Sequence, residues 1–156
     1  MSPHHSLIMS HEAIRLGYSN DFLEIEVLER GTLEGRDEGD LRLGVSVRNG
    51  TFAGSYDQVW IAKDEWLSFL GSMRRLERDR SGQASLVSMS PEEFELHMQV
   101  VDRAGHLAAH GCLSRYHFGH PSGKATRSRI EYHLPVDPSL LRELVLSLEG
   151  FGQPAV

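Results

Sequence analysis

Three histidines of this chain are spaced so that they could form a metal-binding row. His97 and His110 lie in two segments of alternating apolar and polar residues, joined by a tight turn. If Val101 pairs with His106 across that turn, the side chains of His97 and His110 lie opposite each other. Directly opposed Cβ atoms on one face of an antiparallel pair are about 5 Å apart. His133, in a third alternating segment, could extend the row, and imidazoles arranged in this way can bind Zn²⁺ or a similar metal. The alternatives are an exposed polar face without a ligand, or a pH-responsive contact, because neighbouring imidazoles disfavour each other's protonation.

Acidic side chains form the second group that could do chemistry. Glu24 and Glu26 alternate with apolar residues, so they point outward from a half-buried strand. A Gly-rich acidic loop follows over 29–40, and it lacks the regular Asp spacing of a Ca²⁺ loop. Acid–base catalysis would need a carboxylate in a desolvated pocket, which this pattern does not indicate. We expect instead an acidic surface that binds a basic protein partner, composed of Glu24, Glu26, Glu34, Asp37, Glu38 and Asp40.

The nucleophiles and the one glycine-rich segment near a lysine give no support for an enzyme. Cys112 has no base at a fixed position beside it, and we expect a structural thiol. Ser114 does not lie in a Gly-x-Ser-x-Gly sequence. The segment 119–126 has three rather than four residues between its glycines, and Ala125 stands where a phosphate-binding loop has Ser or Thr. We therefore expect neither enzymatic activity nor a cofactor.

Length and charge restrict the class of protein. The 156 residues suit one domain, and we expect a flexible N-terminal arm over 1–12 and a single α+β domain over 13–151. The net charge of −6 argues against nucleic acid as a ligand, since phosphate binding draws on clustered Lys and Arg. No apolar run approaches the roughly 20 residues that cross a bilayer, and the first ten residues lack the Lys or Arg of a signal peptide. The single cysteine cannot form an internal disulfide. We expect a cytoplasmic protein that binds neither membranes nor nucleic acid.

Hydrophobic periodicity predicts the elements that must hold these side chains. Short alternating segments predict strands over 13–16, 22–29, 41–48, 52–60, 84–89, 94–101, 106–113 and 130–134. A helix from Asp64 has an apolar stripe formed by Trp66, Phe69, Leu70, Met73 and Leu76. A last helix begins at Asp137 and has a stripe formed by Leu140, Leu141, Leu144 and Leu148. The predicted class is α+β: a twisted antiparallel sheet of about six to eight strands with two main helices packed on one face.

One turn makes a specific prediction about register. Asn49 and Gly50 are a preferred central pair for a two-residue hairpin turn, because both tolerate positive φ. With these two residues in the turn, Val47 lies opposite Phe52. The buried face of the returning strand is then Phe52, Gly54, Tyr56 and Trp60.

Several segments of the chain carry a resemblance to a known family. They are Asp21–Val27, Thr51–Asp57, Trp66–Leu70, Gly82–Leu86, Phe94–Leu96, Gly105–Leu107 and the helix from Leu140 to Leu148. Over roughly residues 20–150 the chain resembles the WapI-like bacterial immunity proteins. These are patterns of fold more than of catalysis. The resemblance implies a small cytoplasmic protein that binds and neutralises the toxic C-terminal domain of a contact-dependent toxin.

Three functional hypotheses follow. The first is a non-enzymatic cytoplasmic binding protein, which the resemblance makes an immunity protein against a basic toxin domain. The second is a metal-binding or metal-dependent hydrolytic protein that uses His97, His110 and His133. The third is a domain that associates with itself.

Overall fold

The first half of the chain forms a four-stranded antiparallel sheet. The computed structural model describes residues 13–31 and 38–151, so the arm expected over 1–12 lies outside the described residues. The strands are β1 (Ala13–Tyr18), β2 (Asp21–Arg30), β3 (Leu41–Asn49) and β4 (Phe52–Ile61). They lie in the order β1-β2-β3-β4, so each strand pairs with its neighbour in the sequence.

The second half forms another four-stranded antiparallel sheet and the two helices. Its strands are β5 (Gln83–Val87), β6 (Phe94–Val100), β7 (Leu107–His117) and β8 (Thr126–Val136), again in sequence order. The helices are α2 (Lys63–Asp79) and α3 (Leu141–Phe151), with the 3₁₀ turn η1 (Pro138–Leu140) before α3. The predicted α+β class, with about six to eight strands and two main helices, is confirmed: residues 13–31 and 38–151 contain eight strands and two α-helices. The difference from the prediction is that the strands form two sheets rather than one.

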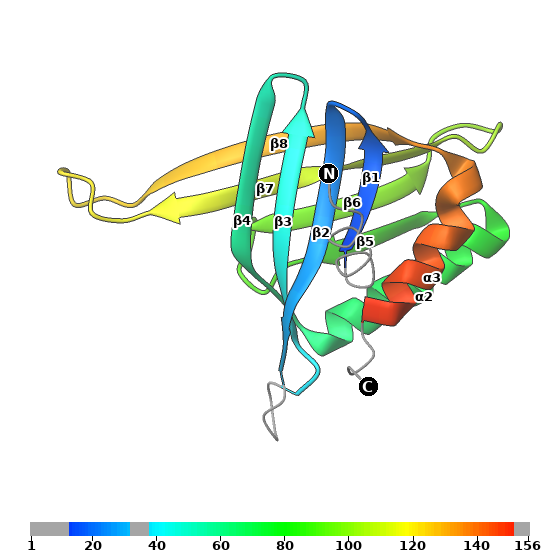
Figure 1. Ribbon diagram of the computed structural model, residues 1–156, viewed down its shortest axis with the longest axis horizontal. Helices are drawn as coiled ribbons and strands as arrows, with labels where there is room; N and C mark the ends of the chain where they lie inside the picture. The colour runs from blue at the N-terminus through cyan, green and yellow to red at the C-terminus, as the bar shows by residue number, and fades with distance from the viewer. Residues whose placement is uncertain (1–12, 32–37, 152–156) are drawn as a thin grey trace, which may run out of the picture.

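The two sheets cover each other, which explains why a single sheet is not formed. Figure 1 shows β1–β4 lying in front of β5–β8 and running crosswise to them, with α2 and α3 at one end. β8 contacts β1, β2, β3 and β4, while α2 contacts β5 and α3 contacts β1. The inner residues of both sheets and both helix stripes therefore form one apolar core. Each sheet therefore keeps one polar outer face.

The β3–β4 hairpin has a different register from the predicted one. Val47 pairs with Gly54 rather than Phe52, so Gly50 and Thr51 form the turn. The reason is that Asn49 is held by tertiary contacts: its Nδ2 donates to Asp21 and its Oδ1 accepts from the backbone of β8. A shift by two residues preserves which side chains share a face, because the strand period is two.

A β-bulge then changes which residues of β4 are buried. The register shifts between Leu43 and Val45 of β3, and a bulge moves the following residues to the opposite face. Val59 and Ile61 are fully buried as a result. The prediction that Trp60 lies on the buried face is wrong, and Phe52 at the strand start is 73% exposed.

Both predicted helices are present. The stripe of α2 is buried as predicted. In α3 the buried residues are Leu141, Leu144, Val145, Leu148 and Phe151. Leu140 departs from the prediction, since it ends η1 and is 52% exposed. Trp66 stacks on Phe151 at 6.0 Å between ring centroids, which joins α2 to α3. In the described part of the chain, neither helix is long and apolar enough to cross a membrane.

The strands β7 and β8 continue beyond the core as a projecting hairpin, defined here as residues 115–129. Phe94, at the start of β6, pairs with Leu113, so β7 leaves β6 at this point and pairs only with β8. Every residue of the projecting hairpin is exposed. Figure 1 shows it extending past the edge strand β4, away from the helices.

Candidate binding surface

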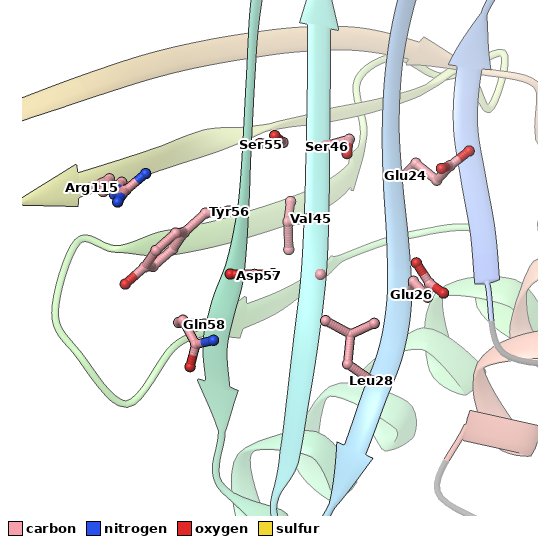
Figure 2. Close-up of a pocket in the computed structure, with 11 residues that line it drawn as sticks. Glu24, Glu26, Leu28, Val45, Ser46, Ser55, Tyr56, Asp57, Gln58 and Arg115 are labelled. Atoms are coloured by element: carbon pink, nitrogen blue, oxygen red, sulfur yellow. The ribbon is translucent and has the colours of Figure 1, made fainter.

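A shallow depression lies on the outer face of the first sheet, and we call it the outer hollow. Glu24, Ser46 and Ser55 form one outward row across β2, β3 and β4, and Glu26 faces Gly44 in the next row. Small side chains at the centre leave a depression of about 600 Å³. Figure 2 shows the acidic side chains of β2 on one side. The hollow is lined by Glu24, Glu26, Leu28, Gly44, Val45, Ser46, Ser55, Tyr56, Asp57, Gln58 and Arg115.

β2 supplies an apolar side chain to this otherwise polar face. Leu28 follows Glu24 and Glu26 on the outward side of β2 and is 38% exposed, and it is the unpaired residue where the register of β2 against β3 shifts between Val27 and Glu29. Its side chain covers Gly44, where a Cβ atom would lie 3.1 Å from Leu28 Cδ1. The outer hollow therefore combines an apolar wall with carboxylates. This combination suits a side chain that has both an apolar part and a positive charge.

Charges of both signs surround the outer hollow. Arg15 of β1 forms an ion pair with Glu24 at 3.0 Å. Arg42 donates to the backbone oxygen of Asp57 at 2.8 Å. In the described part of the chain the carboxylates of Glu26 and Asp57 form no ion pair, so both are available to a basic partner.

The histidine row, consisting of His97, His110 and His133, is the second notable surface. The predicted register is confirmed, since His110 pairs with His97 of β6 and with His133 of β8. Adjacent ring centroids lie 5.1 and 5.7 Å apart and the rings are stacked. Both ring nitrogens of His97 have partners, Ser85 Oγ at 2.8 Å and Glu95 Oε1 at 3.1 Å. Partial burial lowers the pKa of His110, and the two flanking imidazoles lower it further.

The family model of the immunity protein WapI-like family matches residues 14–151. The chain belongs to the WapI-like immunity protein family. The match runs from β1 to the end of α3, so it includes the outer hollow and the histidine row, and it confirms the resemblance seen in the sequence. The chain has no significant match among curated proteins or solved structures.

The structure places the predicted acidic residues of this WapI-like protein in different environments. Glu24 and Glu26 line the outer hollow, and Glu38 is exposed at the end of the β2–β3 loop. Asp40 is only 7% exposed, and its Oδ1 accepts a hydrogen bond from Lys63 N at the start of α2. That carboxylate therefore caps a helix and is not part of an open acidic surface. The predicted positions Glu34 and Asp37 lie outside the described residues.

The histidine row of the WapI-like protein does not converge on a single point. Its three rings lie side by side on three neighbouring strands, as expected for stacked side chains rather than for ligands around one ion. Among residues 13–31 and 38–151, no group of three or more His, Cys, Asp or Glu side chains is placed to hold a metal ion.

The two candidate nucleophiles serve the fold. Cys112 is 2% exposed, and burial raises the pKa of its thiol, which disfavours the reactive thiolate. Ser114 is also buried, and its hydroxyl donates to the backbone oxygen of Glu92.

Sequence reasoning did not find the outer hollow, although it found the two glutamates on one side. The missing components were Leu28, Gly44 and Arg115, the last of which reaches the hollow from β7. A glycine at an outward position of a strand was an available signal, because glycine in a strand often marks a close approach or a depression. The outward position of Leu28 also follows from the alternation of β2, because it continues the series of Glu24 and Glu26.

Proposed function

We propose that this protein is an immunity protein that binds a toxin domain through the outer hollow and thereby neutralises it in the cytoplasm. The observation that carries the proposal is membership of the WapI-like immunity protein family over residues 14–151. Neutralisation by such a protein requires binding rather than catalysis, so we propose a non-enzymatic mechanism without a cofactor.

The chemistry of the outer hollow supports a basic partner. Glu24, Glu26 and Asp57 supply negative charge around a central depression. Leu28 and Tyr56 supply apolar surface for the aliphatic part of a Lys or Arg side chain. The net charge of −6 on the whole chain would speed association with a positively charged toxin.

A basic toxin suggests how neutralisation would occur. A nuclease domain binds its substrate through clustered Lys and Arg. The acidic side of the outer hollow would pair with those cations and occupy the nucleic-acid site. Toxin inhibition would then be steric and electrostatic.

The test is co-expression with a toxin domain encoded beside this chain. We expect the wild-type protein to protect cells and to co-purify with the toxin. The double variant Glu24→Lys/Glu26→Lys reverses the charge of the hollow, and we expect its affinity to fall at least tenfold (about 1.4 kcal/mol) with loss of protection.

A matched control carries the same charge change elsewhere. Asp79 and Glu143 are exposed residues of α2 and α3, at the end of the molecule away from the projecting hairpin (Figure 1). The Asp79→Lys/Glu143→Lys variant should bind and protect like wild type. Absence of both complex and protection with the wild-type protein would contradict the proposal. Equal loss in the two double variants would assign the effect to net charge and not to the outer hollow.

A further inference from the structure

The projecting hairpin has a composition opposite to that of the chain as a whole. Residues 115–129 contain no Asp or Glu, and they carry four cationic side chains in a protein of net charge −6. The cations are Arg115, Lys124, Arg127 and Arg129. Two aromatic side chains accompany them: Tyr116 is 46% exposed and Phe118 is 82% exposed. A large exposed aromatic beside cations is typical of a residue that anchors a protein contact.

The charges favour a protein partner over nucleic acid. Arg127 pairs with Glu92 at 3.0 Å, and Arg129 pairs with Glu131 at 3.2 Å. Two of the four cations are therefore already neutralised locally, which weakens the long-range field that a polyanion requires. The exposed aromatic side chains, above all Phe118, make contacts only at short range. They therefore suit a protein surface with a complementary depression.

The outer hollow of a second copy offers such a surface. It has carboxylates at Glu24 and Glu26, an apolar wall at Leu28, whose side chain covers Gly44, and the small side chains of Ser46 and Ser55 at its centre. A volume of about 600 Å³ is ample for one phenyl side chain. The hairpin cannot insert into the hollow of its own chain, because its base borders that hollow and its tip extends away past β4 (Figure 1).

We infer that two copies of this chain associate reciprocally, with the projecting hairpin of each lying in the outer hollow of the other. Phe118 of one copy occupies the depression beside Leu28 and above Ser46 and Ser55, and Lys124 lies near the carboxylates of β2. The surface is self-complementary because one molecule carries both the hairpin and the hollow, as a two-fold symmetric dimer requires. Pairing of two hairpins edge to edge is disfavoured, since it would place like charges side by side.

Reciprocal association affects which form of the protein binds the toxin, and this consequence rests on the proposed function. The dimer covers the same hollow that we assign to the toxin, so the monomer is the toxin-binding form. Each hairpin makes a small contact, and small interfaces dissociate readily. A toxin would therefore compete with self-association rather than add to it.

The test is sedimentation equilibrium of the full chain without any toxin, over micromolar to near-millimolar concentrations. We expect a monomer–dimer equilibrium that Phe118→Ala weakens by about a hundredfold, because truncating an aromatic anchor costs at least about tenfold and the symmetric contact occurs twice. The control Leu146→Ala removes a 59% exposed side chain from α3 and should leave the equilibrium unchanged. A wild-type chain that stays monomeric at all concentrations, or a dimer that Phe118→Ala leaves intact, would overturn the inference.

A mixing experiment tests the pairing of hairpin with hollow. Phe118→Ala keeps an intact hollow, and Glu24→Lys/Glu26→Lys keeps an intact hairpin. Each variant alone should be monomeric, while an equimolar mixture should form a heterodimer through one restored contact. Dimerisation of the Glu24→Lys/Glu26→Lys variant as strong as that of wild type, or absence of a heterodimer in the mixture, would overturn the assignment. Toxin protection is not measured, so either result leaves the proposed function to its own test.

Discussion

Tyr132 offers a quantitative test of how the second sheet is held together. Its side chain is fully buried on β8, and its hydroxyl donates to the backbone oxygen of Glu95 on β6 at 2.6 Å. To make this contact the tyrosine reaches across β7 at Gly111, its direct neighbour in register. A Cβ atom at Gly111 would lie 1.8 Å from Glu95 O and 2.7 Å from the Tyr132 hydroxyl. The contact therefore depends on glycine at this position.

The structure gives the size of two perturbations. Tyr132→Phe removes one hydrogen bond and leaves a buried carbonyl without this donor, which costs about 1–2 kcal/mol of unfolding free energy. Gly111→Ala places a methyl group against backbone that cannot rotate away, and we expect a loss of at least about 3 kcal/mol. For a chain of this length 1 kcal/mol corresponds to about 2–4 °C in melting temperature. The two variants should thus melt about 2–8 °C and at least about 6 °C below wild type.

Urea unfolding and thermal melts at neutral pH measure both effects. The double variant Gly111→Ala/Tyr132→Phe should remain as unstable as Gly111→Ala, since the clash with Glu95 O persists. Wild-type stability of Gly111→Ala would refute the placement of β6 against β7.

Alkaline titration provides an independent measurement on Tyr132. Burial raises the pKa of its phenol well above the usual value, so ionisation opposes folding. The resulting stability is fully present below pH of about 10 and is lost as pH rises through the folded-state pKa. Tyr132→Phe should lack this alkaline loss, as followed by urea midpoints across the pH range.

Two further predictions concern single side chains. Because the pKa of His110 is lowered in the fold, its contribution to stability is present above pH of about 6.5 and lost as pH falls through the folded-state pKa; His110→Gln should flatten the acid side of the stability profile, while His120→Gln, an exposed control, should not. Asp40→Ala removes the acceptor for the first backbone N–H of α2 and should cost about 1 kcal/mol in urea unfolding, whereas Glu38→Ala should cost almost nothing. An unchanged pH profile for His110→Gln, or equal stability of the Asp40 and Glu38 variants, would contradict these assignments.

Local patterns were sufficient to predict much of the fold. The helical stripe from Trp66 to Leu76 is buried as its spacing indicated. The turn after β6 fixed the register that aligns His97 with His110, because a short turn leaves one way to pair two alternating strands. The alternation of β2 likewise placed Glu24 and Glu26 on the outer face. In each case a single local pattern determines the side-chain direction.

Features that depend on contacts between distant segments were not predicted. The division into two sheets arises because the inner faces of two sheets can cover each other, and the sequence shows only that each strand has one apolar face. The β3–β4 turn moved by one position because Asn49 is bound to Asp21. The sequence predicts strands that end at 113 and resume at 130, whereas β7 extends to His117 and β8 begins at Thr126, because strand residues that bury nothing show no apolar alternation.

The most direct test of the central claim is the affinity of the purified protein for a toxin domain encoded beside it. Isothermal titration calorimetry should show a one-to-one complex with the wild-type chain. Affinity should fall at least tenfold for Glu24→Lys/Glu26→Lys and remain unchanged for Asp79→Lys/Glu143→Lys. Absence of binding by the wild-type chain, or equal affinity for both double variants, would contradict the assignment of the outer hollow as the toxin-binding surface.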